Sequence, residues 1–377
     1  MSGRFTTPRE TLLPVLAAVK DVIERRNTIP VLSNLMLSVT SDSMRLTGTN
    51  LDIEASASVE GQGSEAATTT LPGAMLHDVV RKLPEAADVE ITFDEQTATI
   101  KAGRSRFSLP VLPASDFPIM SGHEFGHRFA LPAKELATAL ATVAFAISTE
   151  ETRYYLNGIF WHLDGEGLAM VATDGHRLAK ARLATPEGAE GMPAVILPRR
   201  VVDLLSKRLP DAKDGTIAIE LSETKIAFDI AGLSVIAKLI DGNYPDYMRV
   251  VPTGNANLFR FSKPSLKEAL DRVSTVLAGS SGQGNGVKLG WNTGPTNQLT
   301  LDALNREHLG SANEAIDIDP LDSAQVEIGF NGRYCQDMLN AAPGDMMLAE
   351  LGDAGSPALF RPEGQAMPLF VLMPMRV

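Results

Sequence analysis

Apolar residues recur at intervals of three and four in three separate stretches of the chain. They are Leu12, Leu13, Leu16, Val19 and Ile23 in the first stretch, Leu136, Leu140, Val143 and Ile147 in the second, and Leu266, Leu270, Val273 and Leu277 in the third. This spacing places them on one face of an amphipathic helix. A proline precedes or opens each stretch, at Pro8, Pro132 and Pro264. Proline suits the first turn of a helix, because an N–H group there has no partner within the helix.

Other parts of the chain alternate apolar and polar residues with a period of two. This pattern predicts half-buried strands at residues 89–93, 217–221, 225–230, 299–301 and 326–330. Several strands separate the predicted helices, without a strict strand-helix-strand order. That arrangement favours an α+β fold, with helices packed on antiparallel sheets, over a doubly wound parallel sheet.

Two short phrases recur in register along the chain. Arg-Phe-x-x-Pro begins at residues 4, 128 and 260, and a second helix opening lies at Leu71-Pro72, Leu197-Pro198 and Phe330-Asn331. Dividing 377 residues by three gives about 126 per copy, close to the commonest domain size. We therefore predict three similar domains, at residues 1–125, 126–256 and 257–377. A repeated module more often builds a shape than a single active site, which favours a geometric function over catalysis.

Composition and charge narrow the class of protein. The formal net charge of −12 argues at first against nucleic acid, because most proteins that grip duplex DNA are basic. No apolar run approaches the ~20 residues that a membrane-spanning helix needs, and the first residues leave no room for a signal sequence. The single cysteine, Cys335, fits a reducing compartment and is expected to be a small buried apolar residue. We expect a soluble, cytoplasmic protein without a membrane partner.

One segment, His123-Glu124-Phe125-Gly126-His127, matches the H-E-x-x-H pattern of zinc peptidases. That motif binds zinc when a helix places both histidines on one face. Glycine at position 126 weakens a helix here, and prolines bracket the segment closely. We therefore predict no metal site, no cofactor and no catalytic residue. A zinc peptidase stays open as an alternative, and metal analysis together with replacement of Glu124 would test it.

Four segments in the second and third copies have a more specific composition. They are Arg153-Tyr-Tyr-Leu-Asn-Gly158, Ala172-Thr-Asp-Gly-His-Arg-Leu-Ala179, Asp241-Gly-Asn-Tyr-Pro-Asp-Tyr247 and Val371-Leu-Met-Pro-Met-Arg-Val377. Taken in this order, with supporting phrases at 29–34, 103–109 and 112–118, they resemble the bacterial sliding clamp, the β subunit of the replicative DNA polymerase. The resemblance covers essentially the whole chain.

The resemblance implies a head-to-tail homodimer in which two chains give six domains, closed as a ring around double-stranded DNA. Such a ring is a non-catalytic processivity factor that holds DNA by topology and independently of sequence. Such a ring does not need the many phosphate contacts that make DNA binding strongly salt-dependent. An acidic chain can therefore still encircle DNA. The residues implied to touch DNA are Arg26, Tyr154, Tyr155, Arg199 and Arg200.

A second implied site is a hydrophobic cleft between the second and third domains. It would receive short peptides, carrying a glutamine and apolar anchors, from the replicative polymerase, the clamp loader and repair polymerases. The cleft residues carried over by motif are Leu156, Thr173, Gly175, His176, Arg177, Leu178, Pro245, Val250, Met373, Pro374, Met375 and Arg376. Methionines adapt to differing side chains, so one surface can receive several partners.

A third implied region is the interface between the two chains. The residues implied there are Arg104, Arg106, Phe107 and Leu109 in the first repeat and Val276 and Leu277 in the third. The glycine-rich stretch 279–286 follows Leu277 and leaves the strength of ring closure open. The chain departs from the family pattern at Asn50, Met248 and Val377. A three-module adaptor that binds proteins but never surrounds DNA is the remaining alternative.

Overall fold

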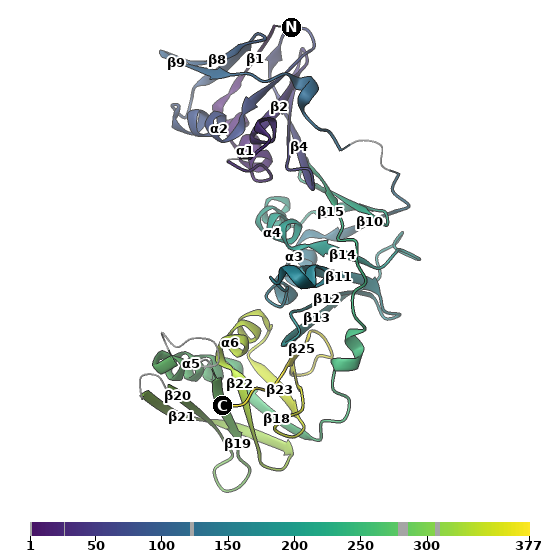
Figure 1. Cartoon of the computed structure of the whole chain (residues 1–377), viewed down its shortest axis with the longest axis vertical. Coiled ribbons are helices and arrows are strands. Elements are labelled where there is room, and N and C mark those ends of the chain that lie inside the picture. Colours follow the sequence, from purple (N-terminus) through teal and green to yellow (C-terminus); the bar gives the residue numbers. More distant parts are fainter. Residues whose placement is uncertain (1, 26, 121–123, 278–285, 306–309) are drawn as a thin grey trace. The chain divides into compact units, whose positions relative to one another are not determined.

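The computed structural model of the protein describes residues 2–25, 27–120, 124–277, 286–305 and 310–377. The chain divides into two compact units. Figure 1 shows its helices and strands, coloured along the sequence. Unit 1 holds residues 1–137, 186–193 and 203–239, and unit 2 holds residues 138–185, 194–202 and 240–377. Arg26, His123 and residues 279–285 of the glycine-rich stretch lie outside the described residues.

Unit 1 contains two antiparallel sheets. The five-stranded sheet has the order β5 (Gln62–Gly63), β1 (Gly3–Pro8), β7 (Asp88–Phe93), β8 (Thr97–Ala102) and β9 (Ser105–Pro110). The eight-stranded sheet has the order β10 (His127–Pro132), β15 (Thr216–Leu221), β16 (Lys225–Ile230), β17 (Leu233–Lys238), β4 (Ile53–Glu60), β3 (Ser43–Thr49), β2 (Asn34–Val39) and β6 (Ala67–Pro72). Antiparallel pairing of β17 with β4 makes this sheet continuous.

Unit 2 contains a twelve-stranded antiparallel sheet. Its order is β14 (Val195–Pro198), β11 (Gly158–Leu163), β12 (Leu168–Thr173), β13 (Arg177–Leu183), β25 (Leu369–Leu372), β24 (Ala358–Pro362), β23 (Met346–Leu351), β18 (Asn257–Ser262), β21 (Gly310–Asp322), β20 (Gln298–Asn305), β19 (Gly286–Trp291) and β22 (Val326–Asn331). Strands predicted from the period of two coincide with β7, β15, β16, β20 and β22, which confirms those predictions.

The α-helices of the described chain follow the two recurring phrases. They are α1 (Arg9–Lys20), α2 (Gly73–Lys82), α3 (Ala133–Ala144), α4 (Arg199–Arg208), α5 (Lys263–Ser274) and α6 (Gly332–Ala341). The three stretches with helical apolar spacing form α1, α3 and α5, and the second phrase opens α2, α4 and α6, so both predictions are confirmed. Short 3₁₀ helices are η1 (Pro30–Ser33), η2 (Ala114–Asp116), η3 (Glu151–Leu156), η4 (Leu209–Ala212), η5 (Tyr247–Val250) and η6 (Thr275–Leu277).

The Arg-Phe-x-x-Pro phrase is a junction between a strand and a helix. Its phenylalanines, at positions 5, 129 and 261, are buried in β1, β10 and β18. The first helical residue then donates its backbone N–H to a carbonyl distant in sequence: Arg9 to Ala87 at 2.9 Å, Ala133 to Gly215 at 2.9 Å and Lys263 to Asp345 at 2.8 Å. Each bond satisfies a donor that has no partner in the first helical turn. The same junction is therefore built three times.

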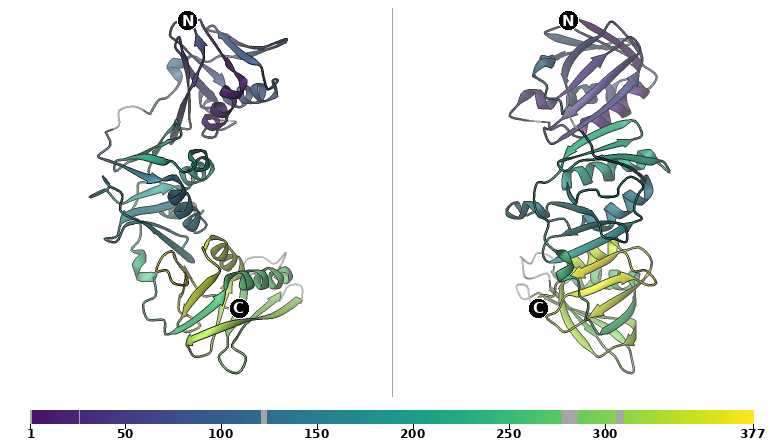
Figure 2. Two further views of the ribbon diagram at one scale, coloured as in Figure 1. Left: turned by 180° about the vertical axis from the view of Figure 1, so that it is seen from behind. Right: turned by 90° about the vertical axis from the view of Figure 1, so that its right-hand side faces the viewer.

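The helices cover one face of the sheets. In unit 1, α1 packs on β3 and β4, and α2 lies beside α1 on β2 and β6. In unit 2, α5 packs on β20 and β21, and α6 lies beside α5 on β22 and β25. Figure 1 and Figure 2 show these helix pairs from three sides. Helices packed on antiparallel sheets confirm the predicted α+β fold.

The core of each unit is apolar, and Cys335 belongs to it. The largest fully buried side chains are Phe5 and Phe228 in unit 1 and Trp161, Trp291, Phe259, Phe261, Phe330, Phe360 and Phe370 in unit 2. Cys335 is 2% exposed, and burial raises the pKa of its thiol to about 12. A thiol with so high a pKa is an inert packing group, as the sequence predicted. No helix among the described residues is both long and apolar enough to cross a membrane.

A buried carboxylate joins the ends of α1 and α4 within unit 1. Asp21 follows α1, and its side chain is 11% exposed. It accepts a hydrogen bond from Lys207 at 2.7 Å and another from Arg208, which also donates to the Ala17 carbonyl at 3.0 Å. Burial alone would raise the pKa of Asp21, but the hydrogen bonds from both cations outweigh burial and leave the pKa below its ordinary value of 3.8.

We expect Asp21→Asn to lower the free energy of unfolding of unit 1 by about 2 kcal/mol at pH 7, because it leaves the Arg208 guanidinium, whose side chain is only 13% exposed, without this carboxylate. Since the folded pKa lies below the unfolded one, the carboxylate stabilises the fold above pH ~4, and this stabilisation is lost as the pH falls through the folded pKa. Urea unfolding between pH 7 and pH 3 should show the difference between variant and parent shrinking in acid.

The matched control for this prediction is Asp52→Asn. Asp52 pairs with Lys238 at 3.2 Å, but both side chains are more than half exposed. An exposed pair of this kind contributes less than about 0.5 kcal/mol. If the two substitutions had equal effects, the stabilising role of the Asp21 cluster would be wrong.

Candidate functional site

The turn between β12 and β13 is bonded by its own side chains. The Asp174 carboxylate accepts the backbone N–H groups of His176 at 2.9 Å and of Arg177 at 3.0 Å. Thr173 Oγ1 donates to the Arg177 carbonyl at 2.7 Å and accepts the N–H of Gly175 at 3.1 Å. Gly175 has a φ of +88°, a left-handed conformation that favours glycine. The turn thereby holds the exposed His176 in a fixed place on unit 2.

Arg177 is enclosed within unit 2. Its guanidinium forms ion pairs with Asp174 at 2.9 Å and with Asp337 of α6 at 2.6 Å. The same group lies 4.3 Å from the centre of the Tyr334 ring and 5.1 Å from that of Phe145. Its side chain is only 12% exposed. Carboxylates and ring faces therefore already engage the guanidinium, so Arg177 connects the turn to α6 and supports the surface from beneath.

The C-terminal segment lies beside this turn. β25 pairs antiparallel with β13, with Val371 opposite Leu178. Just past β25, the Met373 N–H donates to the His176 carbonyl at 2.8 Å. The His176 ring also stacks on that of Tyr334, with centroids 6.3 Å apart. The structure thus brings the turn and the tail together, although about 200 residues separate them in sequence.

An apolar cluster forms the floor under the turn and the tail. Its buried members are Val171, Leu178, Tyr247, Leu359 and Val371, and the partly buried Phe160, Tyr244, Val251 and Leu369 pack around them. The segment 244–251 covers this cluster through its tyrosines. Pro245 in that segment is exposed, and Val250 is 44% exposed. Apolar atoms at the surface above an apolar floor are typical of a peptide-binding site.

The predicted cleft residues differ in what they can offer a ligand. Leu156, Thr173 and Leu178 are buried, Arg177, Pro374 and Met375 are partly buried, and Gly175, His176, Pro245, Val250, Met373 and Arg376 are exposed. Leu156 ends η3, where its carbonyl accepts the Ser148 N–H at 3.1 Å. The exposed members can contact a peptide directly, whereas the buried members shape the surface.

A cavity of about 490 Å³ adjoins the same segment. Its lining is Phe160, His162, Asp164, Glu166, Lys180, Arg182 and residues 244–248. Lys180 and Arg182 pair with Asp164 at 2.8 and 2.6 Å. Burial would raise the pKa of Asp164, but hydrogen bonds from both cations outweigh burial and hold the pKa well below its ordinary value. Burial lowers the pKa of His162, and its Nε2 lies 3.1 Å from the Tyr247 hydroxyl.

Several residues of this region were missed by sequence reasoning. Tyr334 and Asp337 stand three residues apart on α6, so the helical pattern indicates that they share a face. Nothing local indicates that this face meets Arg177. Tyr247 and Val371 lie within the quoted segments. Val371 stands in the continuous apolar run 369–373, which was the available signal for its burial.

The residues expected near DNA fall into different environments. Tyr154 is 54% exposed, and its ring meets that of Tyr155 edge-on with centroids 5.8 Å apart. Arg199 is partly buried and donates to a backbone carbonyl of unit 2 at 2.6 Å, whereas Arg200 is exposed. Arg26 lies outside the described residues. The exposed Tyr154 and Arg200 are the members best placed to meet a ligand.

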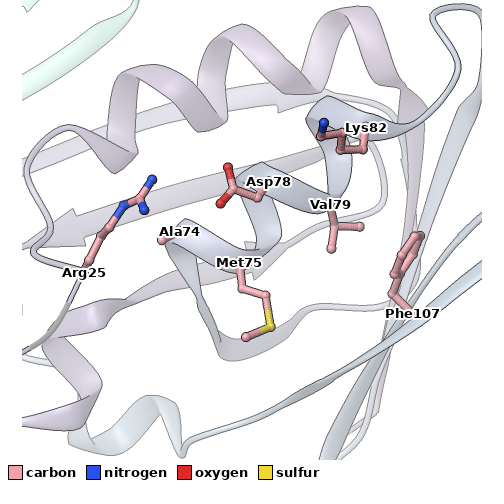
Figure 3. A pocket seen from close by; sticks show the side chains of 7 residues that line it. All are labelled: Arg25, Ala74, Met75, Asp78, Val79, Lys82 and Phe107. Carbon is pink, nitrogen blue, oxygen red and sulfur yellow. The ribbon is translucent and has the colours of Figure 1, made fainter.

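A hollow of about 560 Å³ lies between α2 and β9 in unit 1 (Figure 3). It is lined by Arg25, Ala74, Met75, Asp78, Val79, Lys82 and Phe107. Met75 and Val79 project from α2 toward the hollow that Phe107 borders. Met75 is 51% exposed, and Phe107 is partly exposed. The hollow therefore presents an apolar floor with charged groups around it.

The other residues expected at a subunit interface are unequally accessible. Arg104 and Arg106 are exposed on and beside β9, whereas Leu109 is only 3% exposed and packs within unit 1. In unit 2, Val276 is partly buried and Leu277 is 5% exposed. Phe107 and Val276 are thus the apolar members with the most surface to offer a second chain.

The H-E-x-x-H segment does not meet the condition for zinc binding in the residues that are described. Residues 124–126 form no helix, and His127 begins strand β10. The described part of the segment therefore lacks the helical turn that the zinc motif requires. Among the described residues, no group of three or more His, Cys, Asp and Glu side chains is suited to a metal. His123 itself lies outside those residues.

Comparison with protein families matches nearly the whole chain. Residues 3–121 match the N-terminal domain of the DNA polymerase III beta subunit, residues 130–246 match its central domain, and residues 248–376 match its C-terminal domain. The three models follow one another in the order of the three repeats.

Individual relatives agree over their full lengths. The beta sliding clamp of Caulobacter vibrioides is 41% identical over 380 residues, covering 99% of this chain and 100% of the relative. That of Escherichia coli K12 is 34% identical over 378 residues, with the same coverage. A crystal structure of a sliding clamp from Bartonella birtlesii bound to griselimycin is 42% identical, covers 100% of both chains and has a TM-score of 0.94. The chain therefore belongs to the DNA polymerase III beta subunit family, the bacterial sliding clamps.

Proposed function

We propose that this chain is the processivity clamp of a replicative DNA polymerase. Two copies close into a ring around duplex DNA and tether the polymerase and other replication or repair proteins to it. The observation that carries this proposal is the match of three beta-subunit domain models, in order, along one chain. The chain is a non-catalytic subunit, and it acts by encircling DNA and holding its partners there. We place the domains at residues 1–125, 126–256 and 257–377, whereas the matched models pass from the central to the C-terminal domain between residues 246 and 248.

The net charge of −12 suits a ring that holds DNA by topology. A protein that grips DNA through phosphate contacts loses affinity steeply as salt rises. A closed ring needs only enough positive charge to keep the duplex centred, and acidic groups elsewhere limit sticking. We propose that Arg200 and Tyr154 touch DNA, supported by their exposure, together with Arg26 and Tyr155. Arg199 acts through its bond to the backbone of unit 2.

Partner proteins insert a short peptide at the turn, tail and apolar floor of unit 2. Such a peptide carries apolar anchors that lie against Met373, Met375, Val250 and Pro245. Its glutamine bonds to polar groups near His176. The bonding of tail to turn supports this placement, because it presents these atoms on one surface. Flexible methionine side chains let that surface accept several partners in turn.

The two chains join head to tail. The hollow that Phe107 borders in unit 1 receives the partner subunit's Val276, with its Leu277 beneath. Partial exposure of Phe107 and Val276 supports this pairing, and Arg104 and Arg106 flank it. The protein works in the cytoplasm, where its DNA lies, and a separate loader opens the ring.

The function predicts how the protein leaves DNA. Loaded by a clamp loader with ATP on a nicked circular plasmid, the protein should co-elute with the circle on gel filtration, and cutting the circle once with a restriction enzyme should release it. Release follows because a ring slides off a free end without breaking any specific contact. A circle cut before loading is the matched control for binding at ends.

Three outcomes would contradict the proposal. If the protein stayed on the DNA after the circle was cut, it would bind through direct contacts and not by encircling the duplex. If the protein never stayed on the circle, it would be an adaptor that does not surround DNA. A mass in solution of one 40.4 kDa chain at micromolar concentration would also count against a two-chain ring.

A further inference from the structure

The C-terminal tail crosses two glycines at very short range. The Met375 N–H donates to the Gly329 carbonyl at 2.8 Å. A Cβ atom added to Gly329 would stand 2.4 Å from the Met375 carbonyl oxygen, and one added to Gly286 would stand 2.4 Å from a Val377 methyl carbon. Ordinary contact begins about 1 Å farther out. The tail thus occupies space that is open only because both positions lack side chains.

Strand register places the two glycines on one surface. β19 pairs antiparallel with β22, with Gly286 opposite Asn331 and Lys288 opposite Gly329. Opposed residues share a face and successive residues alternate, so Gly286 and Gly329 lie diagonally on the same face. The C-terminal end of the chain lies beside these strands (Figure 1). Neither glycine has a positive φ, so backbone conformation does not require glycine there, and close approach of the tail does.

The tail is therefore held at two points. At one end, Met373 bonds to the His176 carbonyl, and at the other, Met375 bonds to Gly329. Pro374 spans the two points and has no N–H of its own to bond. At the second point, the tail lies directly against the backbone of β22 because Gly329 has no side chain. Any side chain at position 329 would therefore move Met375 away from the strand.

We propose that Gly329 and Gly286 are positioning residues for partner binding: by leaving β22 and β19 bare, they set the depth and direction of the tail that carries Met373 and Met375. This inference rests on the proposed peptide cleft and adds to it a support that lies beneath the tail, on the side away from the ligand. Neither glycine contacts the peptide. They act through the tail, as supporting residues hold a binding group to within a fraction of an ångström.

The nearest obstacles differ between the two glycines, which separates their effects. A Cβ at Gly329 would meet the Met375 carbonyl oxygen at 2.4 Å as well as Val377 methyl carbons at 2.7 and 2.9 Å, whereas at Gly286 the nearest obstacle is the end of the Val377 side chain. A methyl group at 286 can be accommodated by rotating or removing that side chain. A methyl group at 329 can be accommodated only by moving the backbone of the tail. Removing the Val377 side chain should therefore rescue Gly286→Ala and should not rescue Gly329→Ala.

The test measures binding of a fluorescein-labelled peptide, with a glutamine and apolar anchors, by anisotropy. We expect Gly329→Ala to weaken binding roughly tenfold or more and Gly286→Ala roughly threefold or less. Val377→Gly should restore binding in the Gly286→Ala background only. Gly254→Ala is the matched control, because a Cβ there meets nothing within 4 Å. Dimer mass and melting temperature should match the parent, which separates positioning from loss of fold.

Hydrogen exchange gives a readout that does not depend on the peptide. The Met375 amide should exchange faster in Gly329→Ala than in the parent, because its bond to the Gly329 carbonyl is broken. Unchanged exchange and unchanged affinity in Gly329→Ala would overturn the inference. Failure of the parent itself to bind the peptide would instead contradict the proposed cleft, and the exchange of Met375 would still decide whether the glycines seat the tail. If Gly329→Ala did not fold, the peptide affinities of Gly286→Ala with and without Val377→Gly would test the inference instead.

Discussion

A chain shortened to end at Leu372 is expected to bind a partner peptide at least roughly 100-fold more weakly than the parent while still forming a dimer. The deletion removes Met373 and Met375, and burying a side chain of this size contributes about 1.5 kcal/mol or more. Loss of both amounts to about 3 kcal/mol, and every 1.4 kcal/mol is tenfold in affinity. Titration of a labelled peptide by fluorescence anisotropy measures the loss, and sedimentation measures the dimer.

The truncation should leave the fold intact, which makes the result interpretable. The deleted residues lie past β25, and the pairing of β25 with β13 and β24 stays complete. Met248→Ala is the matched control, because Met248 is 54% exposed on the neighbouring segment and is not among the proposed cleft residues. Equal affinity of the truncated chain and the parent would show that the cleft is misplaced. If the truncation and Met248→Ala weakened peptide binding equally, the loss of any exposed methionine in this region would explain the effect, and the tail would have no special role.

The scaffold was largely predictable because its signals are local and repeated. The burial of Phe5, Phe129 and Phe261 and the helix starts that follow them depend on a few neighbouring residues, and three copies reinforce one another. The structure of the Arg-Phe-x-x-Pro phrase depends on tertiary contacts as well. The phrase ends a strand, and the helix that follows begins with a hydrogen bond to a carbonyl distant in sequence. No local pattern specifies a partner such as Ala87 for Arg9.

The site was predictable only in part, because its members meet through the fold. The turn around Asp174 could be expected from its own residues, since aspartate and glycine form such turns. The enclosure of Arg177 depends on Phe145, which follows α3, and on Tyr334 and Asp337 of α6. A sequence shows an arginine beside a histidine, and it does not show that ion pairs and rings already engage the guanidinium.

The glycines under the tail show the same limit more sharply. Gly286 closes a glycine-rich stretch that predicts a flexible loop, and Gly329 stands between the apolar Ile328 and Phe330 of a predicted strand. A glycine within a strand can mark close approach of another backbone. The backbone that approaches Gly329 belongs to the C-terminal tail, some 45 residues farther along the chain. A contact between residues so far apart in sequence cannot be predicted from the local pattern.

Replacing Phe107 by aspartate is expected to convert the ring into single chains that do not stay on circular DNA. Phe107 borders the apolar hollow of unit 1 with Met75 and Val79 (Figure 3). Placing a carboxylate there against the partner subunit costs about 2 kcal/mol, because the charge loses water without gaining a matched partner. A head-to-tail ring contains this contact twice, so the cost is about 4 kcal/mol and the dimer Kd rises roughly a thousandfold.

Sedimentation across nanomolar to micromolar concentrations would measure this change as a shift from twice 40.4 kDa toward 40.4 kDa. Leu51→Asp is the matched control: it places the same charge on an apolar residue of unit 1 that is 41% exposed and outside the hollow. Because the residues of the proposed cleft all belong to unit 2, monomeric Phe107→Asp should bind a partner peptide as tightly as the parent. That combination, intact peptide binding without retention on DNA, separates ring closure from partner recognition. A stable dimer of Phe107→Asp would instead show that the chains join through another surface.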